Sequence, residues 1–264
     1  MAYGKLGGFE LGYGSDLDLV FLHAAAKGQT TGGPHPIDNA QFFSRLGQRV
    51  IHVLTTHTRA GRIYETDMRL RPSGSSGPLV SHIDAFETYQ RENAWTWEHQ
   101  ALIRSRTVCG DPALRRRYQQ IRQTVLVQPR DLQQLKHDVR DMRLRLMAEN
   151  ALPDNTIFDL KQSRGGIVDI EFLVQFLVLA CAYEHPSLTR WTDNVRLLVT
   201  LMDSGLMDHA TAYRLREAYL TYRAAVHRLS LQNQPAKLPM DRFQTKCDYV
   251  INAWQYFLEE DGPS

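Results

Sequence analysis

The pattern of apolar and polar positions predicts a β-strand close to the N-terminus. Residues 14–22 read Gly-Ser-Asp-Leu-Asp-Leu-Val-Phe-Leu, so polar and apolar side chains alternate before the segment becomes wholly apolar. Side chains two positions apart on a strand share a face, and Asp16 and Asp18 are therefore expected to point the same way. A polar loop follows, after which Asp38 is expected to cap a helix that Gly61 ends.

A second strand is predicted where acidic and basic residues alternate with other side chains. Residues 62–71 read Arg-Ile-Tyr-Glu-Thr-Asp-Met-Arg-Leu-Arg. The period of two places Glu65, Asp67, Arg69 and Arg71 on one face of this strand. A strand, a helix and a second strand form a crossover unit, which would bring the acids of the two strands onto adjacent strands.

Helix signals dominate the rest of the chain. Ser81 and Asp84 have capping-box spacing and predict a helix that runs to about Arg106 and carries Trp95 and Trp97. Tryptophans at such positions more often pack in a core than stack on a base.

After Gly110 the strand signals disappear, and amphipathic or apolar helices are expected to begin near residues 112, 132, 166, 193 and 208, with a last one bearing Trp254. The predicted fold class is α+β: a catalytic domain over residues 1–110, with a mixed sheet and helices, followed by an all-helical bundle over 111–264.

Composition limits the possible functions without selecting one. The chain has 264 residues, 43% hydrophobic and 23% charged, with a formal net charge of +2. Near-neutral charge without a basic stripe disfavours nucleic-acid binding, and the longest apolar run is too short to span a membrane. Cys109, Cys181 and Cys247 are far apart and lack metal-ligand spacing, as expected in a reducing cytoplasm.

The acidic residues of the two strands suggest metal-dependent phosphoryl chemistry. Two carboxylates about 5 Å apart repel by roughly 3 kcal/mol at an effective dielectric near 20, and a divalent cation between them relieves that repulsion. Magnesium prefers one or two carboxylates together with water and phosphate oxygens. Asp67 would complete such a site, and Arg69 and Arg71 would hold a polyphosphate. The alternative for both segments is an edge strand whose charges are solvated or paired.

Five motifs resemble those of the glutamine synthetase adenylyltransferases, which belong to the polymerase-β-like nucleotidyltransferases. The matching segments lie at residues 4–8 (GKLGG), 14–21 (GSDLDLVF), 67–72 (DMRLRP), 95–102 (WTWEHQAL) and 165–172 (GGIVDIEF). Members of that family have two related nucleotidyltransferase halves, each followed by a helical bundle. The run around Trp95 resembles the C-terminal, adenylylating half, in which a strand and a helix usually precede the position of Gly4.

The resemblance implies transfer of AMP from ATP to a tyrosine hydroxyl of glutamine synthetase, with release of pyrophosphate. It implies two Mg²⁺ ions bridged by Asp16 and Asp18, with Asp67 as a ligand of one ion and a possible proton acceptor. It also implies a PII-type signal protein as a second partner. The residues expected to contact the phosphates are Lys5, Gly7, Gly8, Gly14, Ser15, Arg69 and Arg71.

Other interpretations stay open at this stage. A uridylyltransferase of a PII-type signal protein shares the glycine-rich loop, the Asp-x-Asp pair and the bundle, and a catalytically silent regulatory module is a third possibility. A further anion site is predicted at a helix N-terminus, where two glycines follow two cations: Lys161, Arg164, Gly165 and Gly166. The alternative is that the glycines allow close packing of helices. Glu65, on the same predicted strand face as Asp67, is a further candidate site residue.

Overall fold

The computed structural model describes residues 1–30, 34–59, 61, 64–149 and 156–260. The fold is α+β, as predicted, and it divides into two compact units at residues 125 and 126. The sequence-based boundary at residue 110 lies before α5 (Pro112–Leu126), whereas the compact units divide at the end of that helix. Residues 62 and 63 of the second predicted strand lie outside the described residues.

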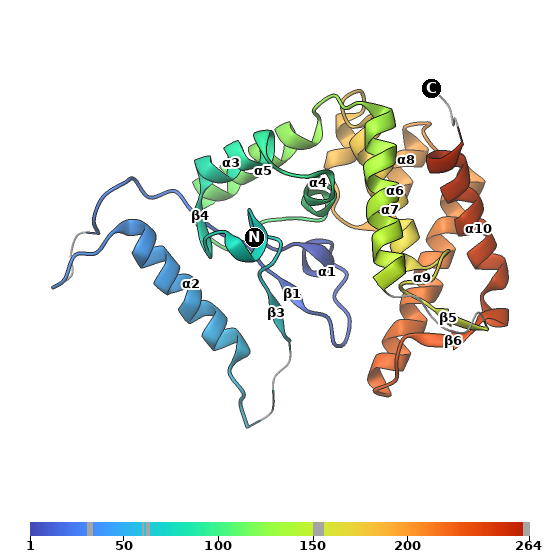
Figure 1. The fold of residues 1–264 in the computed structure, drawn as a ribbon, viewed down its shortest axis with the longest axis horizontal. Coiled ribbons are helices and arrows are strands. Elements are labelled where there is room, and N and C mark those ends of the chain that lie inside the picture. Colours follow the sequence, from blue (N-terminus) through green and yellow to red (C-terminus); the bar gives the residue numbers. More distant parts are fainter. Residues whose placement is uncertain (31–33, 60, 62–63, 150–155, 261–264) are drawn as a thin grey trace. The chain divides into compact units, whose positions relative to one another are not determined.

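The strands of the first unit are short and mostly parallel (Figure 1). They pair as β1 (Leu17–Asp18) with β3 (Thr66–Asp67) and as β2 (Phe21–His23) with β4 (Val80–His82). Ala2 adds antiparallel bridges to Leu19 and to Arg106. The predicted strand–helix–strand crossover with acids on adjacent strands is confirmed, because β1 and β3 pair parallel and the helix after β2 lies between them in the chain.

That helix, α2 (Asn39–Thr55), begins where the sequence predicts. The Asp38 carboxylate accepts hydrogen bonds from the amides of Ala40 and Gln41, the geometry of an N-cap. Gly47 is buried because α2 lies so close to β4 that a Cβ there would come within 2.8 Å of the Val80 side chain.

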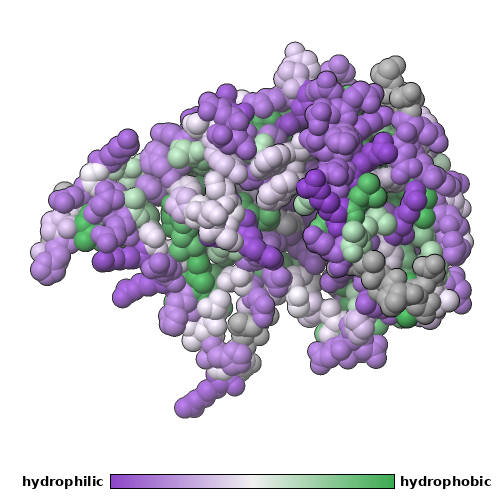
Figure 2. Space-filling view, in the orientation of Figure 1, coloured by the Kyte–Doolittle hydropathy of each residue, from purple (hydrophilic) through white to green (hydrophobic). Residues whose placement is uncertain are grey.

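Much of the apolar surface of α2 stays exposed. Figure 2 shows a largely hydrophilic face, with apolar patches that include one in the region of α2 and β4. The exposed large apolar side chains of this helix are Phe42, Leu46, Val50, Val53 and Leu54.

The prediction of a single helix from Ser81 to Arg106 is wrong. The structure has two helices instead, α3 (Ile83–Glu92) and α4 (Thr96–Ile103), and Ser81 belongs to β4. The imidazole of His82 caps α3 by accepting from the Asp84 amide. The second helix starts anew because the Glu98 carboxylate accepts from the Trp95 amide, which fixes a fresh N-terminus. Trp95 is 71% exposed, so it does not pack in the core.

Two further short elements belong to this unit: the one-turn helix α1 (Gly4–Gly7) and a 3₁₀ turn, η1 (Gly74–Ser76).

The core of this unit contains a buried polar network. The Tyr118 hydroxyl lies 2.7 Å from the Ser105 hydroxyl and 3.2 Å from that of Tyr3. The Arg122 guanidinium donates to the carbonyls of Leu102 and Ile103, which end α4. These bonds fix α5 against α4.

The second unit is mainly helical. Its longer helices α6, α7, α9 and α10 pack alongside one another (Figure 1). Its elements are α6 (Leu132–Glu149), β5 (Ile157–Asp159), α7 (Ile167–Cys181), η2 (Pro186–Thr189), α8 (Asn194–Asp203), α9 (His209–Leu231), β6 (Lys237–Pro239), η3 (Met240–Arg242), α10 (Gln244–Trp254) and η4 (Gln255–Glu259). The predicted helices are confirmed, and Asp193 caps α8.

The prediction that this unit is all-helical is wrong. Strands β5 and β6 pair antiparallel, with Phe158 opposite Leu238. Three-residue strands are too short to show an alternating pattern, and Pro239 at a strand terminus reads as a chain break in the sequence. The pair is held by packing, since the ring of Phe158 lies 5.5 Å from Tyr222 and 5.9 Å from Phe243.

None of the helices within the described residues is long and apolar enough to cross a membrane.

Candidate active site

The central feature of the first unit is the pairing of two aspartates across parallel strands. Asp18 of β1 lies in register with Asp67 of β3. Backbone hydrogen bonds fix this register, since the Leu17 amide donates to the Glu65 carbonyl and the Leu19 amide to the Asp67 carbonyl, at 2.7 and 2.9 Å. Partners in register share a face of the sheet, so both carboxylates lie on the same side, as the sequence predicted.

Burial and neighbouring acids make ionisation of Asp18 costly. They raise the pKa of Asp18 from 3.8 to about 6, with burial as the largest cause, followed by the charges of Asp67 and Asp16. Lys5 and Arg104 lie near enough to oppose this shift. Asp16 itself is exposed and precedes the strand. The site therefore concentrates negative charge on a half-buried carboxylate, which a cation would stabilise.

The pKa of Asp67 is shifted in the opposite direction, by hydrogen bonds from Arg69. The Asp67 carboxylate accepts from the backbone amide of Arg69 at 2.8 Å and from its guanidinium in a bidentate arrangement. These hydrogen bonds lower the pKa of Asp67 below its usual range. The Arg69 side chain is 78% exposed, so it is free to swing towards a ligand. Two adjacent carboxylates with pKa values pushed apart are typical of a functional site.

Gly4 is required by the position of the Asp18 carboxylate. A Cβ at residue 4 would lie 2.2 Å from Oδ2 of Asp18, and the backbone of Gly4 has a φ of +53°. The neighbouring Gly7 and Gly8 were predicted to contact a phosphate. In the structure, Gly4 admits the carboxylate of the site itself, which places α1 directly beside Asp18.

The other predicted phosphate contacts have partners within the chain. The amides of Gly7 and Gly8 donate to the carbonyls of Tyr3 and Gly4, and a Cβ at Gly7 would overlap the Arg104 carbonyl. The Ser15 hydroxyl accepts from the Gly12 amide in a tight turn. A role for these three residues in phosphate binding stays a prediction.

Gly14, with a φ of +70° and open space around it, supplies the turn before β1. Arg71 organises the loop that follows β3. Its guanidinium donates to the carbonyls of Met68, Ser75 and Gly77, at 2.7, 3.2 and 3.3 Å. Glu65 is exposed just before β3. The prediction that a strand continues to Arg71 is wrong, because β3 ends at Asp67 and Arg69 lies in the turn that follows. Arg69 nevertheless stands at the site through its bonds to Asp67, and Arg71 shapes the segment beside it.

The donor set suits a magnesium ion that takes part of its ligands from a substrate. Within the part of the chain that the structure describes, no three His, Cys, Asp or Glu side chains are grouped closely enough to hold a metal by themselves. Asp18 and Asp67 offer two adjacent carboxylates, and burial together with the neighbouring acids raises the pKa of Asp18. Magnesium commonly binds one or two carboxylates and completes its octahedron with water and phosphate oxygens, so the pair fits that ion.

At the predicted anion site before α7, the backbone amides already donate hydrogen bonds within the chain. The amides of Gly166, Ile167 and Val168 donate to the Ser163, Leu160 and Lys161 carbonyls, and that of Gly165 donates to the Asp169 carboxylate at 2.6 Å. A Cβ at Gly165 would come within 2.4 Å of the Cys247 sulfur. Both glycines therefore serve close packing, the alternative weighed from the sequence.

Sequence reasoning missed a buried ion pair beneath the site. The Arg104 guanidinium donates to the Glu10 carboxylate, and both residues are over 90% buried. Glu10 follows α1 and Arg104 follows α4, so the pair ties the glycine-rich segment to the helix that carries the Trp-Thr-Trp-Glu-His-Gln motif. Glu10 and Arg104 each lie two residues beyond one of the quoted motifs, but their 94-residue separation concealed the pairing.

Comparison with known proteins adds an independent observation. Residues 1–121 match the model of the glutamate-ammonia ligase adenylyltransferase family. A bifunctional glutamine synthetase adenylyltransferase/adenylyl-removing enzyme of Hahella chejuensis is 49% identical over 98% of the chain, and one of Pseudomonas syringae pv. tomato is 48% identical over 96%. The chain belongs to the glutamine synthetase adenylyltransferase family.

This adenylyltransferase-family chain spans only 28% and 27% of the length of those two relatives. Residues 133–248, in the helical unit, match a different model, that of GlnD PII-uridylyltransferase. The two halves of the chain thus resemble two families that were weighed against each other from the sequence. Four of the five quoted motifs lie within residues 1–121. They indicated the same family as the comparisons that cover nearly the whole chain.

Proposed function

We propose that this chain transfers AMP from ATP to a tyrosine hydroxyl of glutamine synthetase. The observation that carries the proposal is the register pairing of Asp18 with Asp67, in which burial and acidic neighbours raise the pKa of Asp18 to about 6. The names of the relatives support the choice of nucleotide and acceptor. On this proposal the first unit is a polymerase-β-like nucleotidyltransferase domain, and the chain corresponds to the adenylylating half of its family.

In the proposed reaction, the tyrosine oxygen bonds to the α-phosphorus of ATP while the bond to the bridging oxygen breaks. AMP is then esterified to the tyrosine and pyrophosphate leaves. Asp18 and Asp67 would hold magnesium together with phosphate oxygens, with Asp16 beside them, and the ion would neutralise the charge that develops on those oxygens. Two ions are proposed by analogy with two-metal phosphoryl transfer.

Arg69 has two successive roles in this scheme. Without substrate it pairs with Asp67 and lowers the pKa of that carboxylate. A carboxylate with a lowered pKa is a weak proton acceptor. When the guanidinium moves to the triphosphate, Asp67 is released to ligate the ion and to accept the tyrosine proton. Lys5, whose charge already acts on Asp18, would offset the remaining phosphate charge.

A second candidate has a specific observation behind it. The match of residues 133–248 to the GlnD PII-uridylyltransferase model supports either a PII-type signal protein as regulatory partner or, on the alternative function, as uridylyl acceptor. The regulatory role is the one we favour, because the residues that carry the chemistry lie in the unit that matches the adenylyltransferase model.

The two candidates are separated by giving the chain both nucleotides and both acceptors. The purified chain is incubated with magnesium and either ATP or UTP labelled at the α-phosphate, together with glutamine synthetase or a PII-type protein. The proposal predicts label from ATP on a tyrosine of glutamine synthetase. Label from UTP on the PII-type protein would replace it with the alternative.

A further inference from the structure

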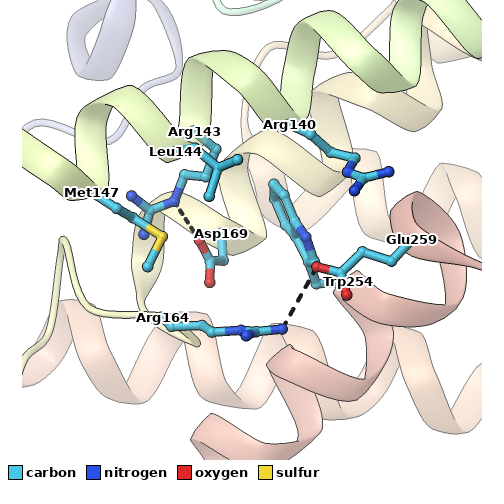
Figure 3. A pocket seen from close by; sticks show the side chains of 8 residues that line it. All are labelled: Arg140, Arg143, Leu144, Met147, Arg164, Asp169, Trp254 and Glu259. Atoms are coloured by element: carbon cyan, nitrogen blue, oxygen red, sulfur yellow. Dashed lines mark hydrogen bonds and ion pairs between the residues drawn. The ribbon is translucent and has the colours of Figure 1, made fainter.

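The helical unit contains a cavity in which arginine side chains meet an aromatic wall (Figure 3). It has a volume of about 140 Å³ and lies among α6, the segment that precedes α7, the end of α10 and η4. Arg143 comes from α6, Arg164 from the segment before α7, and Trp254 from α10. Neither the adenylyl-transfer site nor the occupied amides at the N-terminus of α7 account for this cavity.

Its lining has more positive than negative charge. Two acids face it, and each already has an arginine: Asp169 accepts from Nε of Arg143 at 2.5 Å, and Glu259 lies 3.6 Å from Arg164. A third arginine, Arg140, also lines the cavity and makes no ion pair with any described residue. One positive charge is therefore uncompensated at the cavity wall.

The buried guanidinium of Arg143 also has an unused donor. Arg143 is 2% exposed; its Nε binds Asp169 and its Nη2 donates to the Gln162 carbonyl at 2.7 Å. Its Nη1 is buried and has no hydrogen-bond partner among the residues that the structure describes. Buried donors are nearly always satisfied, so this nitrogen leaves the positive charge of Arg143 only partly neutralised by hydrogen bonds.

The size of the cavity limits what it can take. A cavity of about 150 Å³ accommodates a molecule the size of benzene. ATP, with three phosphates, a ribose and a base, is far larger, which separates this cavity from the nucleotide site. Leu144, Met147 and Trp254 supply an apolar wall opposite the charged groups.

We propose that this cavity binds a small organic anion. Its carboxylate or phosphate head group accepts hydrogen bonds from Arg164 and is attracted by the charge of Arg143, and its apolar body lies against Trp254. Arg140 adds positive charge at the rim. Because Glu259 pairs with Arg164, it competes with the ligand for that guanidinium. The site thus has a built-in acidic competitor, which gives the proposal a distinctive test.

Binding is measured by calorimetry on the 264-residue chain with benzoate and phenyl phosphate, at ionic strength matched with chloride. The neutral analogue benzamide has the size of benzoate without its charge. The proposal predicts saturable binding of at least one of the two anions and none of benzamide. Tighter binding of benzoate assigns a carboxylate head group, and tighter binding of phenyl phosphate assigns a phosphate.

Four variants make the test specific. Arg164→Gln and Arg140→Gln should each weaken binding, the former by about tenfold, and both residues are exposed, so the fold should persist. Glu259→Gln should tighten binding severalfold by freeing Arg164. Arg145→Gln is the control, since this exposed arginine lies on the same helix and pairs with Asp141 outside the cavity.

The proposal is overturned if benzamide binds as well as benzoate, if neither anion binds, or if Arg164→Gln leaves the affinity unchanged. Competition by ATP for the same anions would also overturn it, because the cavity would then be part of a nucleotide site. Thermal unfolding of each variant without ligand checks that a loss of binding does not reflect a loss of structure.

Discussion

Asp18 and Asp67 are direct partners across two parallel strands, yet the pKa values of their carboxylates are shifted in opposite directions. Burial and acidic neighbours raise the pKa of Asp18, whereas the guanidinium of Arg69 lowers that of Asp67. On the proposed function, the pair would release one arginine and gain a cation when a triphosphate binds. This relationship underlies most of the predictions that follow.

Replacing Asp18 with Asn should stabilise the chain without substrate. The folded chain with a raised Asp18 pKa keeps a proton that the unfolded chain has already lost, so this group's favourable contribution is present below pH 3.8 and disappears as the pH rises through about 6. Above pH 6 the variant should be more stable by about 1–2 kcal/mol, after discounting for the partial exposure of Asp18.

The measurement is urea unfolding of wild type and Asp18→Asn from pH 4 to 8. The stability difference should grow between pH 4 and 6 and then level off. Glu92→Gln, at an exposed acid on α3, serves as the control and should give a flat difference. A pH-independent difference for Asp18→Asn would mean that its pKa is not raised.

Gly4→Ala should damage the site, whereas Gly14→Ala should cost only backbone strain. Both glycines have positive φ, at +53° and +70°, but a Cβ at Gly4 would lie 2.2 Å from the Asp18 carboxylate and one at Gly14 would meet nothing within 4 Å. We expect Gly14→Ala to lose about 1 kcal/mol and Gly4→Ala to lose clearly more, with displacement of Asp18. Equal losses in chemical unfolding would contradict the close approach of α1 to Asp18.

ATP and magnesium should stabilise the chain more together than their separate effects add up to. On the proposed function, the carboxylate pair should bind magnesium weakly until phosphate oxygens complete the ligand set. At a hundredfold excess over the dissociation constant, linkage gives about 2.7 kcal/mol, a shift of several degrees in Tm. Asp67→Ala should remove most of this synergy in calorimetric scans. Equal shifts with ATP alone and with ATP plus magnesium would remove the metal from the account.

The buried pair of Glu10 and Arg104 should be sensitive to the loss of one partner. Glu10→Gln leaves a buried guanidinium without its counter-charge, which typically costs about 3–5 kcal/mol. The double variant Glu10→Leu with Arg104→Met removes both charges and should cost much less. Chemical unfolding of the two variants tests this, and a double variant less stable than Glu10→Gln would argue against a charge-pair effect.

The sequence was informative where a function depends on local spacing. The strand–helix–strand pattern predicted that Asp18 and Asp67 lie on adjacent strands, and single capping residues such as Asp38 and Asp208 placed helix starts correctly. Contacts between distant segments were not predictable in this way. The partner of Arg104 lies 94 residues away, and that of Asp169 lies 26 residues away on another helix.

Two other misses have local causes. Trp95 has the apolar character of a core residue, but the Glu98 carboxylate starts a new helix there and leaves the ring exposed. Arg69 is still predicted to contact a phosphate, and the structure adds its pairing with Asp67, which was not predicted. An exposed arginine takes the best acceptor available, which the sequence alone cannot identify.

The most direct test of the central claim is adenylyl transfer by the wild-type chain and its Asp18→Asn variant. Both are incubated at pH 8 with magnesium, α-labelled ATP and glutamine synthetase, and the label is located by peptide mapping. The account predicts label on a tyrosine with the wild type and a loss of at least about a thousandfold with Asp18→Asn, while Glu92→Gln stays active. Transfer by Asp18→Asn at a rate near that of the wild type would contradict the assignment of the strand pair as the catalytic centre.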